Sequence, residues 1–483
     1  MWSDRLPEKR LRRLTKRLQA VVPTPAPRSR GARTPLRTGG KAGPSPLQVA
    51  EELRELPGFA WLDGGEDGHR LVAQPRAVLS VRNGRAGITG AGARTSFQAG
   101  GFELLEAAFS AWGGASATLV GYFGYELGGE VEPLPPPPPD DLALPDLFLG
   151  LYDSALRWDG HGWSLESTDA WRRAGDPDPV IEAERLLAAA RRRPEPEVPT
   201  GSLAAGPVVS RPSRLGFEAA VSRIVERIAS GEIFQMNLCR RLETRLAQRR
   251  LWPLYLRLRA ASPAERGAFL DLGRGRAVLS ISPERFLTVK DGFVETRPIK
   301  GTRPRGDNPR QDRALARELL ESEKDRAELT MIVDVARNDL GRVCETGSVG
   351  LASHAELMTL PTVHHTVSTV RGRLRPDTGP AGLLRATFPP ASITGAPKIR
   401  AMAVIAAEEE RRRGPAMGAL GWISLGGDLD LAVAIRTAAA ARGRIAYHAG
   451  CGIVADSDPE QELAESTAKA LAFLAALGVR ERA

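Results

Sequence analysis

Short runs of β-forming residues alternate with stretches of helical apolar spacing along most of this chain. The hairpin-type turn Arg82-Asn83-Gly84 joins two of the expected strands. We expect strands over Leu71–Pro75, Ala77–Val81 and Gly84–Ile88, and helices over Gly101–Trp112, Asp178–Arg193 and Phe217–Ser230. The pattern therefore predicts a protein that contains both strands and helices.

Two further expected helices carry acidic residues on one face. One covers about residues 312–340, and the other begins at Ser457 or Asp458 with Pro459 in its first turn. The residues that share a face are Glu321, Asp325 and Glu328 on the first helix and Glu462, Glu465 and Lys469 on the second. If these faces meet, their carboxylates suit Mg²⁺ with waters completing its octahedron. Two solvated salt-bridge faces are the alternative, and the spacing does not decide between them.

Composition divides the chain into three parts. Residues 1–46 are basic and then rich in proline, glycine and arginine, which predicts a disordered tail. Within it, residues 5–18 could form a short basic helix. Residues 47–200 form an N-terminal subdomain, a proline-, glycine- and serine-rich linker follows, and residues 215–480 form a region dense in motifs.

The composition also excludes several classes of protein. No stretch approaches the roughly 18 uninterrupted apolar residues of a membrane span, and no apolar signal core follows the basic start. We therefore expect a cytoplasmic protein without a membrane partner. Cys239, Cys344 and Cys451 are widely separated, which indicates neither a disulfide framework nor a zinc site.

The net charge of +9 comes from the N-terminal tail. Residues 1–44 contain twelve Lys/Arg and two acidic residues, so they carry +10 and the remaining 439 residues carry −1. Such a tail could contact nucleic acid or an anionic surface, or it could be a solvated extension. Because no aromatic residues alternate with the charges as base-stacking platforms, nucleic-acid binding is the less favoured interpretation.

The stretch Glu295–Arg305 contains the residue best suited to covalent chemistry. Lys300 follows the β-type run Phe293–Thr296 and stands between Pro298 and Gly301, which predicts a short strand that gives way to a turn. A lysine that is partly desolvated at such a place can act as a neutral nucleophile. A solvated or ion-paired lysine is the ordinary alternative.

Two other charged residues stand at the ends of expected strands. Glu284 follows the apolar strand end Ser280-Ile281-Ser282, where burial would favour a general acid. An ion pair of Glu284 with Arg285 or Arg303 is the alternative. Arg436 is a candidate group for binding a carboxylate.

Two glycine-containing turns and a histidine pair complete the candidates. Ser392–Lys398 precedes an apolar helix, and His448–Ile453 joins a strand to the C-terminal segment. The backbone amides of both turns could bind an anion or approach a ligand closely. His364 and His365 are candidate metal ligands, although such a pair is more often one core and one solvent-facing imidazole.

Taken together, these motifs resemble those of the chorismate-utilising enzymes. The stretches that carry the resemblance are Glu232–Leu238, Ser282–Phe286, Arg297–Thr302, Asp325–Glu328, Asp334–Arg342, Ser392–Lys398 and Gly452–Ser457. The match is strong over about 215–478, weaker over 50–160, and absent from the tail. It implies an α/β (α+β) fold that forms a single large two-sheet sandwich covered by helices.

The resemblance also implies roles for single residues. Glu328 and Glu465 match the Mg²⁺-binding glutamates of the family, and Asp325 and Glu462 match acids that hold the waters of the ion. Glu284 matches the general acid. The residues matched to chorismate binding are His365, Arg436, Lys469, Ser392, Thr302 and Gln235, with the backbone of Gly450, Cys451 and Gly452.

Lys300 distinguishes the branches of the family. Anthranilate synthases have alanine in the Pro-Ile-x-Gly-Thr motif, whereas the aminodeoxychorismate synthases have lysine, which is thought to attack C2 of chorismate before ammonia adds at C4. The resemblance therefore implies component I of the latter, making a precursor of 4-aminobenzoate and folate, with ammonia from a separate glutamine amidotransferase. Anthranilate synthesis is the alternative. A nucleic-acid binder built on an inactive scaffold is a third hypothesis.

Overall fold

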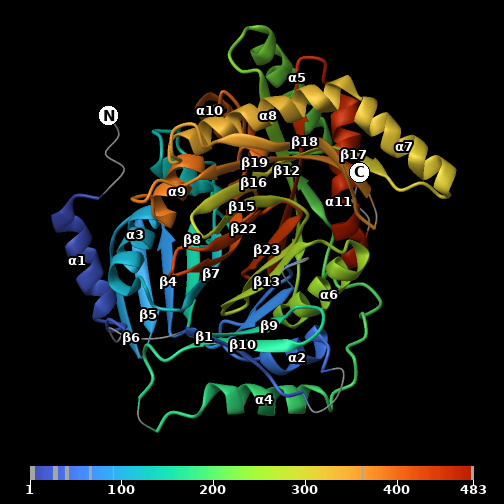
Figure 1. Cartoon of the computed structure of the whole chain (residues 1–483). Helices are drawn as coiled ribbons and strands as arrows, with labels where there is room; N and C mark the ends of the chain where they lie inside the picture. Colours follow the sequence, from blue (N-terminus) through green and yellow to red (C-terminus); the bar gives the residue numbers. More distant parts are fainter. Residues whose placement is uncertain are drawn as a thin grey trace.

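Two large β-sheets packed face to face form the body of the protein. The computed structural model describes residues 6–25, 31–38, 43–64, 68–90, 92–173, 175–361 and 363–479. Each sheet has 12 strands, and helices lie around the two sheets (Figure 1). Leu270 and Val278 of one sheet pack with Tyr122 and Phe148 of the other in one buried cluster. The two-sheet sandwich expected from the sequence is therefore confirmed.

The first sheet contains the long strand pair β12 and β24. Its strands lie in the order β1 (Gly31–Pro35), β10 (Trp163–Thr168), β9 (Ser154–Trp158), β3 (His69–Val72), β2 (Ala60–Leu62), β13 (Arg266–Gly273), β14 (Arg276–Ser282), β23 (Thr437–Ala441), β24 (Arg444–Ile453), β12 (Gln235–Arg245) and β11 (Val209–Arg211). The short strand β20 (Gly395–Ala396) pairs with the start of β12.

The second sheet carries the Pro-Ile-Lys-Gly-Thr segment at one end. Its order is β17 (Ile299–Pro304), β19 (Val363–Arg373), β16 (Phe293–Arg297), β15 (Arg285–Lys290), β22 (Leu429–Val433), β21 (Ala419–Ser424), β7 (Thr118–Phe123), β8 (Leu147–Tyr152), β4 (Ala77–Arg82), β5 (Arg85–Gly90) and β6 (Ala93–Gln98). A further strand, β18 (Gly350–Thr359), pairs with β19. The expected hairpin is present between β4 and β5, where Asn83 and Gly84 have φ of 50° and 71°.

Helices cover the sheets. They are α1 (Glu8–Gln19), α2 (Pro46–Leu53), α3 (Gly101–Trp112), α4 (Pro179–Ala190), α5 (Arg214–Ala229), α6 (Leu251–Ala261), α7 (Pro309–Glu321), α8 (Glu323–Gly341), α9 (Pro380–Thr387), α10 (Lys398–Glu408) and α11 (Pro459–Leu477), with 3₁₀ turns η2 (Tyr125–Glu130), η3 (Gln248–Arg250) and η4 (Ala391–Ile393). Over the described residues, none of the helices has both the length and the apolar character needed to cross a membrane.

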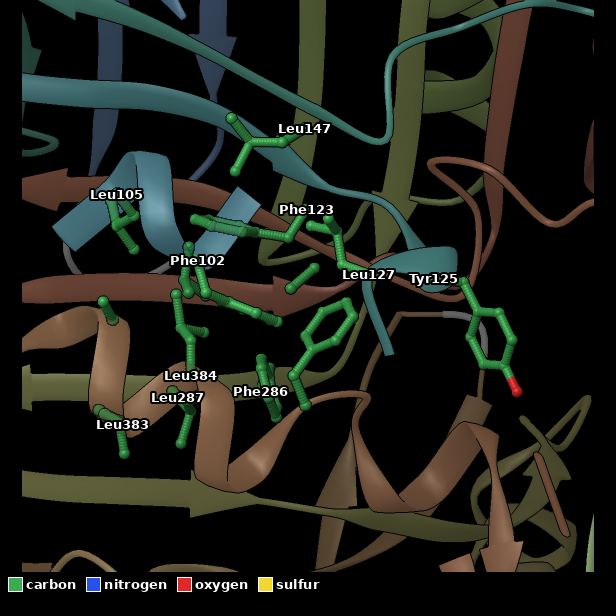
Figure 2. Packing of buried hydrophobic residues seen from close by; sticks show 14 of the residues in the cluster. Phe102, Leu105, Phe123, Tyr125, Leu127, Leu147, Phe286, Leu287, Leu383 and Leu384 are labelled. Atoms are coloured by element: carbon green, nitrogen blue, oxygen red, sulfur yellow. The ribbon is translucent and has the colours of Figure 1, made fainter. Parts of the chain in front are cut away.

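The N-terminal and C-terminal parts of the chain share both sheets. In the first sheet β2 pairs with β13, and in the second β7 pairs with β21. A close view of the core shows the same sharing (Figure 2). There Phe102 of α3 and Phe123 of β7 lie in one buried cluster with Phe286 of β15 and Leu384 of α9. Regions 47–200 and 215–480 are thus joined by continuous hydrogen-bonded sheets and a common core.

The expected helix over residues 312–340 is wrong in one respect, because two helices occupy it. Ser322 has an extended backbone (φ −66°, ψ 108°) and caps α8 by accepting a hydrogen bond from the Asp325 backbone N–H. This cap ends α7 at Glu321. Glu321 therefore does not continue the helical face that carries Asp325 and Glu328.

The described part of the N-terminal segment differs from the disordered tail that we expected over 1–46. The apolar face of α1 packs against α3, and its Leu14 and Leu18 are buried. Trp112 and Trp171 donate indole hydrogen bonds to the carbonyls of Val22 and Pro23, at 3.1 and 2.8 Å. Strand β1 adds to the edge of the first sheet. The short basic helix considered over residues 5–18 is therefore present as α1, and residues 1–5, 26–30 and 39–42 lie outside the described residues.

We expect Leu18→Ala to destabilise the whole protein by about 2–5 kcal/mol, because it removes a fully buried side chain between α1 and α3. Urea unfolding followed by tryptophan fluorescence measures the change. Arg13→Ala, on the exposed face of α1, is the matched control and should stay within about 0.5 kcal/mol of the parent. Equal stability of the two variants would show that α1 does not dock on the fold.

Candidate active site

Lys300 points into the protein from a bulged strand. It pairs with Thr366 across β17 and β19, while Thr302 pairs with the adjacent His365, so Gly301 is an extra residue with φ of 69°. Only glycine adopts that backbone conformation without strain. The Lys300 side chain is 12% exposed, and its Nζ lies 3.4 Å from Glu328 Oε2 on α8. The amine is therefore neither solvated nor remote from the acidic helix.

Gly452 of β24 lies where three side chains converge. A Cβ atom there would be 3.0 Å from Lys300 Nζ, 3.1 Å from Gln235 Nε2 and 3.6 Å from Glu328 Oε2. Pairing of β12 with β24 sets Asn237 opposite Gly452, which brings Gln235 to this position. The Gln235 Oε1 atom is buried and has no hydrogen-bond partner among the described residues. Side chains from both sheets and from α8 thus surround Gly452.

The start of α11 supplies the second group of charges. Lys469 Nζ lies 2.7 Å from Glu465 Oε1 and donates to the Gly450 carbonyl at 3.0 Å. Burial alone would raise the pKa of Glu465, but the ammonium groups of Lys469 and Lys300 hold it below its usual value. Glu462 is buried, with Oε1 accepting from the Ser457 hydroxyl at 2.7 Å. Its Oε2 has no partner among the described residues.

Glu284 and Arg436 stand where the chain crosses between the two sheets. Glu284 lies between β14 and β15, and Arg436 lies between β22 and β23. The two crossovers are hydrogen-bonded to each other, since Val433 N–H donates to the Glu284 carbonyl and Ile281 N–H to the Arg436 carbonyl. Arg436 has a left-handed backbone (φ 49°), a strained state that is common at functional sites.

The surroundings of these two side chains differ. Glu284 is buried, which raises its pKa to about 7, although the Ser392 side chain, the Lys300 charge and the backbone at Ile299 each lower it in part. The Arg436 guanidinium makes no hydrogen bond or ion pair with any side chain of the described ranges. Glu284 can therefore carry a proton near neutral pH, and Arg436 is available for an anion.

The histidine pair divides into two roles. His364 is buried and contacts Asp312 and Thr359 at 3.0 and 2.9 Å, so it is held within the protein. His365 contacts the Gly301 carbonyl and the Thr302 hydroxyl through Nδ1, at 3.1 and 3.0 Å. Burial lowers the pKa of His365 to about 4, so this imidazole is neutral. Its Nε2 is buried without a partner in the described part of the chain.

The remaining predicted residues are more peripheral. Asp325 forms an ion pair with Arg303 at 3.2 Å, the arginine that we had considered for Glu284. The Cys451 thiol is buried beneath α11 and donates to the Glu462 carbonyl at 3.2 Å, so only its backbone can face a ligand at the Gly450–Gly452 turn.

Sequence reasoning missed one residue that the structure makes prominent. Arg413 ends the run Arg411-Arg412-Arg413, whose charge is typical of a solvated surface. It is instead buried and paired with Glu409. No spacing in the sequence distinguishes it from its two neighbours.

A divalent cation fits the acidic residues of this site. Glu328 and Glu465 both lie close enough to Lys300 to interact with its charge, and the buried Glu462 Oε2 lacks a partner in the described chain. The Cys451, Glu462 and Glu465 ligand atoms also lie within 4.8 Å of one another. Because Mg²⁺ prefers oxygen ligands, the glutamates rather than the thiol suit that ion.

Comparison with known proteins agrees with this arrangement. A family model described as chorismate binding enzyme matches residues 57–475. This chain belongs to the chorismate-binding enzyme family.

Individual family members cover much of the chain. The aminodeoxychorismate synthase of Streptomyces griseus is 38% identical over 449 residues, which are 86% of this chain and 60% of that protein. The aminodeoxychorismate synthase component 1 of Salmonella typhimurium is 40% identical over 347 residues, 72% of this chain and 74% of the relative. The crystal structure of anthranilate synthase component I from Streptococcus pneumoniae superposes with a TM-score of 0.72 at 29% identity, covering 84% of this chain and 91% of that one.

We expect Gly452→Ala to impair chorismate turnover without destabilising the protein. The added methyl group would meet the flexible ends of Lys300 and Gln235, which can move aside, so their positions change while the fold remains. Displacement of reacting groups by about 1 Å lowers rates by roughly tenfold to a hundredfold. Gly341→Ala, where a Cβ meets nothing within 4 Å, is the control. Parent-like kcat/KM for Gly452→Ala would contradict this geometry.

Proposed function

We propose that this chain converts chorismate and ammonia to 4-amino-4-deoxychorismate, as component I of an aminodeoxychorismate synthase. The observation that carries the proposal is the inward-pointing Lys300, 3.4 Å from Glu328 and beside Gly452. The Salmonella and Streptomyces griseus relatives bear the name of this activity. In the Pro-Ile-x-Gly-Thr motif, lysine is the residue that the resemblance associates with amination at C4.

The charges of the site suit a dianionic ring. Arg436 and Lys469 supply two cations, and the backbone of Gly450–Gly452 supplies close approach to a carboxylate. The neutral His365 offers an unpartnered Nε2 that can face the ring or its substituents. Gln235 and Thr302 lie beside Lys300 and His365, where they can fix the orientation of the substrate.

The proposed chemistry begins at Lys300. The Lys300 ammonium must first lose a proton, and the amine so formed makes a bond to C2 of chorismate while the ring double bonds shift and the C4–oxygen bond breaks. Glu284 donates its proton to the departing hydroxyl, which leaves as water. Ammonia then forms a bond to C4, and the reverse shift of the double bonds expels the Lys300 amine from C2. The positive charge that the Lys300 nitrogen gains on attack is lost when it leaves as a neutral amine, and the ammonium group formed at C4 returns its extra proton to the Glu284 carboxylate.

Glu328 and Glu465 are the residues that would hold Mg²⁺, and Asp325 and Glu462 are the acids that would hold its waters. When bound, the ion supplies positive charge for a substrate carboxylate and competes with the Lys300 ammonium for Glu328. The side chain of Lys300 itself needs no large movement to reach a ligand placed over Gly452.

The ammonia would come from a separate glutamine amidotransferase. The name component 1 of the Salmonella relative fits such an arrangement. The direct test supplies purified chain with chorismate, Mg²⁺ and ammonium, and adds a lyase that converts the product to 4-aminobenzoate. Release of anthranilate and pyruvate without the lyase would instead support anthranilate synthesis, the activity named for the Streptococcus pneumoniae structure.

We expect Lys300→Ala to abolish most 4-aminobenzoate formation in the coupled assay, because the variant has no amine to attack C2. Loss of a covalent nucleophile of this kind lowers kcat by roughly 10³-fold or more. Anthranilate should become detectable, since the site then has the residue found in the other branch. Lys324→Ala, an exposed lysine on the same helix as Glu328, is the control. Full activity of Lys300→Ala would show that Lys300 is not the nucleophile.

The pH dependence of kcat/KM should report the protonation of Glu284. A general acid works in its protonated form, so activity should fall as pH rises through about 7, the value to which burial raises the pKa of Glu284. Glu284→Gln should lower kcat by roughly 10²- to 10⁴-fold and remove this alkaline limb. A parent profile that stays flat from pH 6 to 8 would argue against Glu284 as the acid.

A further inference from the structure

A buried arginine joins three elements behind the site. Arg413 follows α10 and lies fully inside the protein, with its guanidinium 4.4 Å above the ring of Tyr125 in η2. Figure 2 shows the Tyr125 ring pointing away from the Phe102 and Phe123 cluster, at the edge of that core. The charge of Arg413 is balanced by Glu409, which accepts hydrogen bonds from Arg413 Nε at 2.9 Å and from Arg413 Nη2 at 2.6 Å.

The other hydrogen bonds of the Arg413 side chain go to backbone carbonyls next to predicted site residues. Nη1 donates to the Ile393 carbonyl at 2.8 Å, and Nη2 donates to the Asn237 carbonyl at 2.7 Å. Ile393 follows Ser392 in η4, and Asn237 follows Gln235 by two residues in β12. One planar cation thus fixes both segments, which a flexible ammonium with three donors could not match in geometry.

The same two segments are also tied to each other and to Glu409. Asn237 N–H donates to the Thr394 carbonyl at 2.7 Å. Cys239 N–H donates to Glu409 Oε1 at 2.8 Å. The Arg413–Glu409 pair is therefore a fixed framework against which η4 and the start of β12 are both positioned.

We propose that Arg413 is a positioning residue, which holds Ser392 in the small cavity that it lines with Glu284, and Gln235 beside Lys300, through the Ile393 and Asn237 carbonyls. The proposal rests on the proposed role of Glu284 as the general acid. Arg413 touches neither the substrate nor the reacting atoms. Its effect is transmitted by the backbone of η4 and β12.

The charged groups around Glu284 determine how the pH profile would change if Arg413 no longer held η4 in place. Lys300 is the charged side chain that acts on Glu284 directly. Asp339 lines the same small cavity as Glu284 and Ser392, but it is neutralised by Lys398. Arg285 is paired with Glu295. Ser392 lowers the pKa of Glu284, so a displaced Ser392 should move the alkaline limb of kcat/KM to higher pH.

The test compares Arg413→Lys, Ser392→Ala and the double variant by the pH profile of ammonia-dependent 4-aminobenzoate formation. We expect Arg413→Lys to lower kcat/KM by roughly tenfold and to shift the alkaline limb upward in the same direction as Ser392→Ala. The double variant should show no further shift, because Arg413→Lys acts on Glu284 through the position of the Ser392 hydroxyl, which Ser392→Ala removes. Arg412→Lys, whose guanidinium contacts the Pro138 carbonyl away from the site, is the matched control and should keep the parent profile.

The outcomes separate the positioning role from folding and from the proposed function. An unshifted profile with a smaller active fraction would mean that Arg413 serves only the fold, which would overturn the proposal. If Arg413→Lys does not fold, Glu409→Gln is measured instead, because it weakens the same ion pair. We expect Glu409→Gln to move the alkaline limb of kcat/KM to higher pH, and an unshifted limb would overturn the proposal. A wild-type enzyme that forms no product would refute the proposed function, and a wild-type profile without an alkaline limb would refute the role of Glu284 as the general acid and with it this proposal.

Discussion

The site depends on the antiparallel pairing of β12 with β24 and on the missing side chain at Gly452. The pairing fixes Gln235 and the Gly450–Gly452 backbone in one register. The glycine leaves space that Lys300 and Glu328 approach from the opposite sheet and from α8. A side chain at position 452 would push apart the groups that the two sheets bring together there.

Charge balance is the second constraint on this arrangement. Taking ionised groups out of water is unfavourable unless each is paired. Here the glutamates of α8 and α11 lie beside lysines, and Asp325 lies beside Arg303. Within the described chain, the Arg436 guanidinium has no side-chain hydrogen bond or ion pair, and Gln235 Oε1 and His365 Nε2 have no hydrogen-bond partner. A polar ligand that supplies hydrogen-bond partners to such unpaired atoms gains the most binding free energy.

Local patterns were sufficient to predict parts of this structure. The Asn83-Gly84 turn and the helix Gly101–Trp112 follow from residue types with strong backbone preferences. The turn expected at Lys300 is wrong, because residues 299–304 continue as strand β17 with a bulge at Gly301. The i, i+4 spacing of Glu465 and Lys469 likewise predicts their ion pair. The roles expected for Lys300 and Glu284 depended on a resemblance, because spacing alone left both with ordinary alternatives.

Other features depend on contacts between distant parts of the chain. Ser322 divides the expected long helix only because its side chain caps α8 and its backbone is extended. The docking of α1 depends on α3 and on two tryptophan indoles, Trp112 and Trp171, that donate to the carbonyls of Val22 and Pro23. The burial of Arg413 depends on Glu409 and Tyr125. A sequence pattern contains none of these distances.

The shared sheets have a consequence for how this enzyme can be divided. Cutting the chain between its two halves would leave β2 and β7 without β13 and β21, and each half would present long rows of unsatisfied amide and carbonyl groups. Neither fragment would be a foldable unit, and both would be prone to association with other exposed strands. The two halves are therefore expected to fold together as a single piece.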